Sequence, residues 1–298
     1  MNQPVTTHAR QRSKAKLRLI PHHFIKAISI SFISILLIAC GDGANSSATN
    51  VNKEHKKALH ISTSAGDFAD FVRDYIGPEL EKSGYTVKLT EMSDTKVQNL
   101  SVAEGSVDLN IVQHRPYLDE FNETHKTDLI PLVQVPTAPY GLYPGKLPTL
   151  SAVKEGATIG IPSNVTNYAR GLWILEQIGW IKLNKEIPNR FRALATDIVE
   201  NPYNLQIIEI AGPQMTRAKA DLDYAIINGN YVIDSGMNLS EALHIESSKH
   251  FINWVVVNEP NKNAPWAKQV VDIINSDGFK HYTTEKLPHY DLPLSWDK

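Results

Sequence analysis

Residues 59–89 read LHISTSAGDFADFVRDYIGPELEKSGYTVKL and determine the fold class. Residues 59–63 have the composition of a short strand. Apolar residues then recur at helical spacing over 68–80, and Gly84 follows as a stop signal. Apolar residues alternate over 85–89, which indicates a second strand. A strand, a helix and a strand in this order predict parallel strands joined by a right-handed crossover.

The same alternation continues along the chain in two sets, the second beginning near residue 157. We predict further strands at 107–112, 129–135, 140–143, 157–161, 205–210, 224–227 and 251–257, and further helices at 96–103, 116–123, 167–178, 214–220 and 264–275. Alternating strands and helices in two sets predict two α/β lobes. Open α/β sheets bind ligands beyond the carboxyl ends of their strands, so we expect the binding residues at strand-to-helix turns.

The first 40 residues have the layout of a bacterial secretion signal. Six basic residues and no acidic residue precede Cys40, and the apolar stretch at 27–39 is shorter than the roughly 20 residues of a spanning helix. The stretch ends in Leu37-Ile38-Ala39-Cys40, which resembles the lipobox of bacterial lipoproteins. We therefore predict a signal peptide at 1–39 and lipidation of Cys40, whose acyl chains would hold the protein at a membrane.

Composition narrows the class of protein further. Beyond residue 39 the 298-residue chain keeps 24 of its 30 basic residues and all 32 acidic residues, a formal net charge of −8. Nucleic-acid binding calls for basic patches, so we expect no nucleic-acid partner. Residues 41–57 contain one branched aliphatic residue and are typical of a flexible tether. Cys40 is the only cysteine, so its lipidation leaves no disulfide in the fold.

Two strand-to-helix turns carry residues suited to ligand recognition. His114 and Tyr117 are three apart after the strand at 107–112 and can share one face as the next helix begins. Asn167 and Arg170 have the same spacing after the strand at 157–161, where an arginine fork and an amide can hold a carboxylate. The structural alternatives are a buried histidine with a half-buried tyrosine, and a capping asparagine with a surface arginine.

A third turn, Asn228-Gly229-Asn230-Tyr231, follows the strand at 224–227. Asn-Gly is also typical of a β-hairpin. The preceding strand lies in an alternating α/β context, which favours a turn from strand to helix.

Signatures of enzymes are missing from the sequence. It contains no Gly-x-Ser-x-Gly elbow, no His-Glu-x-x-His and no glycine-rich phosphate loop. The histidines after residue 39 are scattered, so we predict no metal site and no cofactor. A membrane-anchored hydrolase using His114 with Asp119 lacks an identifiable nucleophile. We therefore predict a binding protein without catalytic residues.

Seven segments and one late residue carry a resemblance to a known family. The segments are VDLN (107–110), QHRPYL (113–118), GLY (141–143), ATIGIP (157–162), NYAR (167–170), TDIVENP (196–202) and AIINGNY (225–231), and the residue is Asn253. In this order they resemble the methionine-binding lipoproteins (NlpA/MetQ type) of ABC importers. The resemblance extends from about residue 59 to about residue 279, nearly the whole domain after the tether.

The resemblance implies a periplasmic-binding-protein fold, in which two α/β lobes enclose a ligand cleft and are joined by two crossing segments. We expect these crossings near 139–143 and 252–256. The predicted organisation is a signal peptide at 1–39, a lipidated tether at 40–57, lobe 1 at 58–139 plus 254–298, and lobe 2 at 140–253. Closure of the lobes would bring their residues together around the ligand.

The resemblance also implies roles for the residues at the turns. Arg170 looks like the clamp on the α-carboxylate of an amino-acid ligand, with Asn167 beside it. Asn228 and Asn253 look like polar partners of the same head group. Pocket walls from the other lobe are implied for His114 and Tyr117.

Two positions depart from the family pattern. Val112 and Thr95 stand where the family usually has aromatic residues that pack on the methionine side chain. A contact between sulfur and an aromatic ring contributes about 0.3–1.5 kcal/mol, so their loss removes a preference for the thioether. We expect methionine, a related amino acid or a short peptide as the ligand, and we hypothesise from these two departures that it is not L-methionine.

The family context implies partners and a location. We expect an ABC permease with its ATPase as partners, a small-molecule ligand and a monomeric protein. The protein would lie on the periplasmic side of the bacterial envelope, anchored at Cys40 to the inner or the outer membrane. The alternative is a scavenger or signalling lipoprotein that binds a small carboxylate-bearing ligand without an importer.

Overall fold

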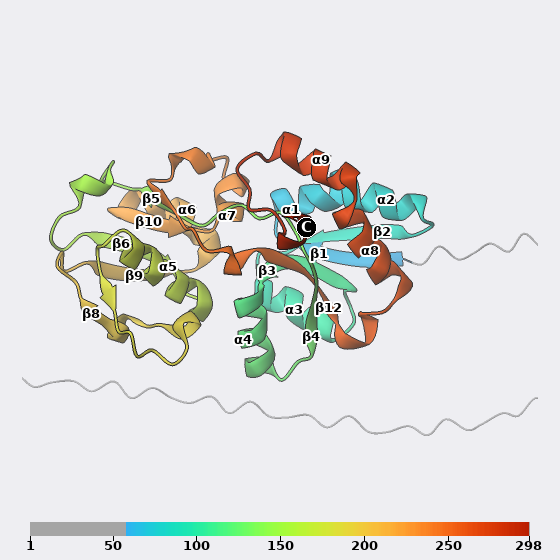
Figure 1. The fold of residues 1–298 in the computed structure, drawn as a ribbon, viewed down its shortest axis with the longest axis horizontal. Helices are drawn as coiled ribbons and strands as arrows, with labels where there is room; N and C mark the ends of the chain where they lie inside the picture. Colours follow the sequence, from blue (N-terminus) through green and yellow to red (C-terminus); the bar gives the residue numbers. More distant parts are fainter. Residues whose placement is uncertain (1–57, 298) are drawn as a thin grey trace, which may run out of the picture. The chain divides into compact units, whose positions relative to one another are not determined.

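The structure is a computed structural model and describes residues 58–297 (Figure 1). The predicted signal peptide at 1–39, the lipidation of Cys40 and the tether at 40–57 lie outside the described residues. Among the helices at 58–297, none is long and apolar enough to cross a membrane.

The first sheet contains five strands in the order β2-β1-β3-β12-β4. Its strands are β1 (Ala58–Thr63), β2 (Thr86–Glu91), β3 (Leu109–His114), β4 (Leu129–Gln134) and β12 (Asn253–Asn258). As predicted from residues 59–89, β1 and β2 are parallel, and β1 also pairs in parallel with β3. β12 runs antiparallel to both β3 and β4 and returns the chain to this sheet from the second one.

Helices cover both faces of the first sheet (Figure 1). One face packs against α1 (Asp67–Asp70), a π-helical segment (Phe71–Ile76), α2 (Gly77–Lys82), α8 (Pro265–Asn275) and α9 (Asp277–Lys286). The other face packs against α3 (Thr95–Ala103) and α4 (Arg115–His125). Buried apolar side chains on both faces make this a three-layer α/β lobe.

The helix predicted over 68–80 is continuous but contains the π-helical turn at Phe71–Ile76. Pro78 lies in the first turn of α2 and has no N–H to donate to the preceding turn. The N–H of Gly77 instead reaches the carbonyl of Val72, and a Cβ on Gly77 would lie 2.6 Å from that oxygen. A wider turn and a residue without a side chain therefore accommodate the proline.

The second sheet also contains five strands, in the order β11-β5-β10-β6-β9. These strands are β5 (Gly141–Pro144), β6 (Thr158–Pro162), β9 (Gln206–Ile210), β10 (Tyr224–Ile227) and β11 (His244–Ile245). One face packs against α5 (Val165–Gln177), and the other against α6 (Met215–Ala218) and α7 (Gly229–Asp234). β7 (Lys182–Leu183) and β8 (Ile198–Glu200) form a separate small sheet.

The chain passes between the two sheets at 135–140 and again at 246–252. Both crossings lie a few residues before the expected positions, because β5 begins at Gly141 and β12 already begins at Asn253. The first crossing is hydrogen-bonded to the start of β12, directly after the second crossing: the N–H of Val135 donates to the carbonyl of Asn253 at 2.9 Å, and the N–H of Asn253 donates to Thr137 Oγ1 at 2.8 Å.

Four elements were not predicted from the sequence: β7, β8, β11 and α9. The three strands have two or three residues, too few for a periodicity. α9 is largely polar, and only Phe279 and Thr283 are buried in it. The strand predicted at 107–112 is displaced, since β3 runs to His114. At Asn228-Gly229 the strand-to-helix turn is correct and the hairpin is not, because α7 begins at Gly229.

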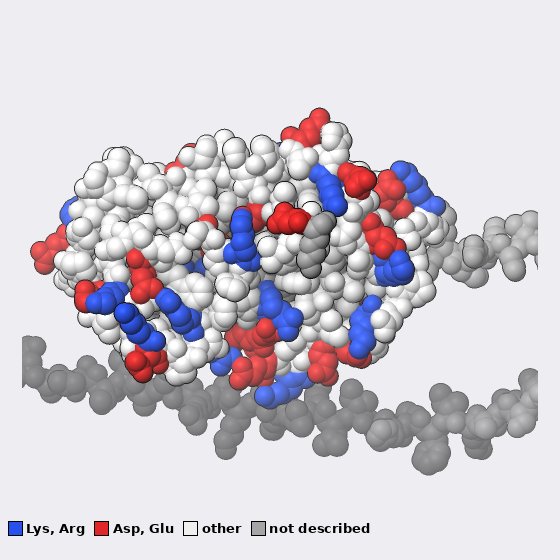
Figure 2. Space-filling view, viewed as in Figure 1, with Lys and Arg blue, Asp and Glu red and all other residues white. Residues whose placement is uncertain are grey.

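Charged side chains on the face shown in Figure 2 are mixed in sign, with Lys and Arg beside Asp and Glu. Exposed ion pairs in the structure include Arg115 with Asp119 and Lys268 with Asp272. Exposed pairs of this kind contribute little to stability, typically below about 1 kcal/mol each.

Candidate ligand-binding site

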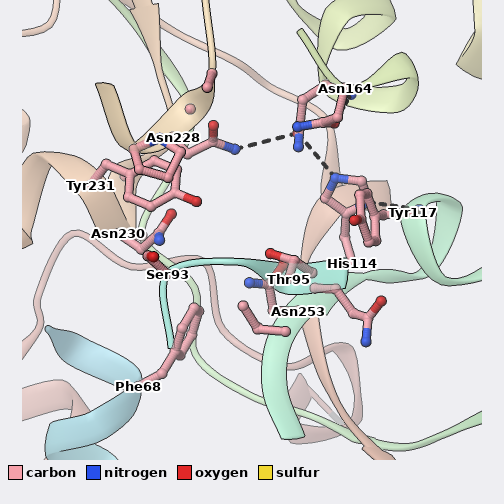
Figure 3. Close-up of a pocket in the computed structure, with 18 of the residues that line it drawn as sticks. Phe68, Ser93, Thr95, His114, Tyr117, Asn164, Asn228, Asn230, Tyr231 and Asn253 are labelled. Atoms are coloured by element: carbon pink, nitrogen blue, oxygen red, sulfur yellow. Dashed lines mark hydrogen bonds between the residues drawn. The ribbon is translucent and has the colours of Figure 1, made fainter. Parts of the chain in front are cut away.

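A cavity of about 430 Å³ lies between the two sheets and is lined from both. Small-molecule sites typically have volumes of about 300–1,000 Å³. The structure brings all eight predicted site residues to the lining of this cavity: Thr95, Val112, His114, Tyr117, Asn167, Arg170, Asn228 and Asn253. Figure 3 shows Asn228, Asn230 and Tyr231 along one side of it, and Asn164, His114 and Tyr117 along the other.

The lining residues are positioned by the ends of strands. Asp94 follows β2, His114 ends β3, Asn164 follows β6 and Asn228 follows β10. These strands all end at the cavity, and antiparallel β12 begins there with Asn253 opposite His114. The cavity therefore occupies the place where open α/β sheets bind ligands, as the sequence predicted.

Arg170 is buried rather than at the surface, with 4% of its area exposed. Its Nε donates to Glu246 Oε2 at 2.8 Å, and its Nη2 donates to Glu246 Oε1. Its carbon Cζ lies 4.2 Å from the ring centre of Tyr140 and 4.3 Å from that of Phe251. One edge of the guanidinium is thus already bound to a carboxylate of the protein, and Nη1 on the other edge points toward Asn167 at 3.3 Å.

Asn167 connects residues from both lobes through one oxygen. Its Oδ1 accepts from Arg170 Nη1 and from Asn228 Nδ2, both at 3.3 Å, and lies 3.1 Å from His114 Nε2 (Figure 3). His114 Nδ1 accepts from the N–H of Tyr117 at 3.2 Å, so the proton of the neutral ring is on Nε2 and is donated to Asn167. The cap of α5 is Asn164, whose Oδ1 accepts from the N–H of Asn167 at 3.0 Å.

His114 is held in its neutral form. Burial and, after it, the positive charge of Arg170 lower the pKa of its ring to about 3, against the hydrogen bond to Asn167. His114 therefore acts as a hydrogen-bonding wall of the cavity. His114 and Asp119, the pair named for a hydrolase, do not line the same cavity. Asp119 is exposed, pairs with Arg115 at 2.6 Å and lines a different cavity.

Aromatic residues at other positions also line the cavity. Val112 and Thr95 line the cavity as expected, and so do Phe68 from α1 and Tyr231 from α7. The sequence patterns include both aromatic residues but do not assign either of them to the cavity. The helical spacing over 68–80 predicts Phe68 only as a core residue, and Tyr231 lies in the segment at 225–231 without an implied role.

Other residues of the site escaped sequence analysis. Glu246 lies on a crossing segment, and nothing in its local sequence distinguishes it from a surface glutamate. Gln113 lines the cavity and belongs to a buried amide network, in which Asn99 Nδ2 donates to Gln113 Oε1 and Asn110 Nδ2 donates to Asn99 Oδ1, both at 2.8 Å. The adjacent Gln113-His114 pair was a usable signal for Gln113. Across residues 58–297, no group of three or more potential metal ligands is found.

Comparisons with known proteins agree with the fold. A family model described as NlpA lipoprotein matches residues 59–294. The methionine-binding lipoprotein MetQ of Bacillus subtilis is 30% identical over 270 residues, covering 88% of this chain and 97% of that protein. An ABC-transporter periplasmic substrate-binding protein from Coxiella burnetii has a TM-score of 0.73 at 32% identity, covering 79% of this chain and 99% of that one.

A nutrient-binding protein from Burkholderia cenocepacia, solved bound to methionine, has a TM-score of 0.74 at 28% identity, with coverage of 79% of this chain and 99% of that one. These similarities confirm the two-lobed periplasmic-binding fold that the seven sequence segments implied. The chain belongs to the NlpA lipoprotein family.

Proposed function

We propose that this chain is the solute-binding protein of an ABC importer and captures an amino acid or a short peptide between its two lobes. The main support is that residues from both sheets line one cavity of about 430 Å³. A lipid on Cys40 would keep the protein at the periplasmic side of the envelope, where it meets a permease and its ATPase. Lobe 1 would comprise 58–139 and 254–298, and lobe 2 would comprise 140–253.

The polar residues at one end of the cavity suit the head group of an amino acid. Arg170 Nη1 supplies a charged donor, and the side-chain amides of Asn228 and Asn253 lie at the same cavity. Because Glu246 already compensates the charge of Arg170, the clamp is weaker for a carboxylate than a free arginine fork. This arrangement favours a neutral zwitterion, whose ammonium group offsets its carboxylate.

At positions 95 and 112 the cavity lacks the aromatic residues that the family usually packs against the thioether of methionine. Val112 and Thr95 supply no ring, so up to two contacts of about 0.3–1.5 kcal/mol each are missing. We hypothesise that L-methionine is not the preferred ligand. The double variant Val112→Phe/Thr95→Tyr should then bind L-methionine about threefold or more tightly than the wild type does.

Calorimetry with the full chain in detergent tests the proposal. The panel contains L- and D-methionine, other amino acids and dipeptides, after a thermal-shift screen that exploits stabilisation by bound ligand. Micromolar or tighter binding of one compound is expected. Binding of none of them would reject the function, and tight binding of L-methionine alone would reject the altered specificity.

The importer role needs a separate measurement. The permease and its ATPase, reconstituted in vesicles, should hydrolyse ATP and take up the identified ligand faster when this protein is added. A ligand that binds tightly without stimulating transport would point to the scavenger or signalling alternative.

A further inference from the structure

Hydroxyl groups and one carboxylate line part of the cavity, where Figure 3 also shows Phe68, Asn230 and Asn253. Ser93 and Asp94 follow β2, Thr95 begins α3, and Tyr117 lies in the first turn of α4. Figure 3 shows Ser93 and Thr95 beside the cavity. Val112 is the aliphatic residue among them.

These polar groups have capacity for hydrogen bonds that the protein itself does not use. Asp94 Oδ1 accepts from the N–H groups of Lys96 and Val97 at 2.8 and 3.2 Å, which caps α3. Within residues 58–297, no protein group pairs with Asp94 Oδ2 or with the hydroxyls of Ser93, Thr95 and Tyr117. This part of the cavity thus presents three hydroxyls and one carboxylate oxygen.

Two tyrosines, Tyr117 and Tyr231, line the same cavity. Burial raises the pKa of both phenols, and nearby negative charges raise it further, those of Glu120 and Asp94 for Tyr117 and that of Asp94 for Tyr231. The two phenols come from α4 and α7, on opposite sides of the cavity. Both are therefore protonated donors facing a region that also contains a carboxylate acceptor.

The energetic consequence depends on what covers these groups. Ser93 and Asp94 are exposed and Thr95 is half-buried, so a thioether laid over them would displace water without replacing its hydrogen bonds and would bind poorly. Sites built from such groups reject ligands that lack the matching polar atoms far more strongly than apolar pockets reject a change of size. An amide group matches this lining because its N–H donates to a carboxylate while its C=O accepts from hydroxyls.

We propose that this part of the cavity binds a carboxamide group of the ligand, through Thr95, Ser93 and the free oxygen of Asp94. The proposal rests on the proposed function, since it assigns the part of an amino-acid or peptide ligand beyond its head group. The amide can come from a side chain, as in glutamine, or from the peptide bond of a dipeptide.

Calorimetry with L-glutamine, L-methionine, L-norleucine, L-lysine and alanyl-alanine separates these chemistries on the full chain. Glutamine and methionine have similar length, so their comparison isolates the amide. We expect glutamine or alanyl-alanine to bind at least tenfold more tightly than methionine and norleucine. Tighter binding of glutamine would identify a side-chain amide, and tighter binding of alanyl-alanine would identify a peptide bond.

Two variants of Thr95 test the contact itself. Thr95→Val keeps the size and removes the hydroxyl, so it should reduce the ratio of amide-ligand to methionine affinity at least fivefold. Thr95→Ser keeps a hydroxyl and should retain the preference for the amide ligand. Thr284→Val, an exposed position on α9, serves as the matched control for the loss of a threonine hydroxyl.

The outcomes distinguish failure of this inference from failure of the proposed function. Tightest binding of methionine or norleucine, or an unchanged ratio in Thr95→Val, overturns the amide assignment while leaving an amino-acid binder. Tightest binding of lysine overturns it in favour of an ammonium group at Asp94. Binding of none of the compounds overturns the proposed function and this inference together.

Discussion

Replacing Glu246 with glutamine should weaken the fold and strengthen the binding of a carboxylate ligand. Glu246 and Arg170 are both buried, with exposures of 7% and 4%, and are joined by two hydrogen bonds. Glu246→Gln preserves the size of the side chain and one acceptor but removes the charge that compensates Arg170. The cation then remains beneath the rings of Tyr140 and Phe251 with no counter-ion from the protein.

The magnitude follows from the burial of the pair. Removing one partner of a buried ion pair costs about 3–5 kcal/mol. Because the amide still accepts one hydrogen bond, we expect the free energy of unfolding to fall by about 3 kcal/mol. For a domain of this size, 1 kcal/mol shifts the Tm by about 2–4 °C, which gives a decrease of about 6–12 °C. A ligand carboxylate that replaces the missing counter-ion regains about 1.5–3 kcal/mol, the net value of a hydrogen bond to a charged group.

Thermal unfolding with and without saturating ligand measures both effects. Glu246→Gln should start from a lower Tm but gain more from the ligand than the wild type, by about 3–12 °C. Glu209→Gln, at an exposed position on β9, controls for the loss of one carboxylate. Equal ligand-induced shifts in Glu246→Gln and the wild type would show that Arg170 does not hold the ligand carboxylate.

Three further predictions concern His114, Gly229 and Cys40. Because the pKa of His114 is lowered to about 3, the unfolded chain takes up a proton as the pH falls below about 6.5, whereas the native protein does not. In urea titrations between pH 6 and 4.5, His114→Gln should therefore lose less stability than the wild type, by up to about 1.4 kcal/mol per pH unit. Equal losses in the two proteins would contradict the lowered pKa. Gly229→Ala would place a Cβ 2.5 Å from the carbonyl oxygen of Pro139, so we expect the free energy of unfolding, measured by chemical denaturation, to fall by about 1–3 kcal/mol. An unchanged denaturation midpoint would show that the crossing segment shifts to admit the methyl group. Cys40→Ser should abolish incorporation of a labelled fatty acid and partition into detergent, and normal maturation of that variant would reject the lipoprotein signal.

Much of the fold could be predicted because its elements carry strong local patterns. The unit at 59–89 alternates at strand period, then at helical period, and β1 and β2 are parallel as a consequence. α9 could not be predicted in this way, since Phe279 contacts the core through tertiary packing and the rest of the helix is polar. The π-helical turn before Gly77 also has no signature in apolar spacing; it follows from Pro78.

Some residues of the candidate site could likewise be predicted from local sequence, and one could not. His114, Asn167 and Asn228 could be predicted because each comes directly after a strand or within the first turn of the next helix. Glu246 could not, because its role depends on a side chain 76 positions away in the sequence. The prediction that Arg170 offers a whole fork to the ligand needs revision for that reason: the edge formed by Nε and Nη2 already holds Glu246.

The position of Glu246 would connect ligand binding with a movement of the lobes. Glu246 begins the crossing segment at 246–252, and Phe251 on the same segment lies 4.3 Å from Arg170 Cζ and 5.0 Å, between ring centres, from His114. A hinge motion absorbed by this segment would therefore move the counter-ion and one ring of the arginine site together. Since a ligand shifts a conformational equilibrium only through its different affinity for the two states, contacts of Arg170 that change with the hinge supply the required difference. Glu246→Gln should accordingly alter the ligand-induced closing of the lobes as well as the affinity, because it removes the link between the hinge segment and the head-group clamp.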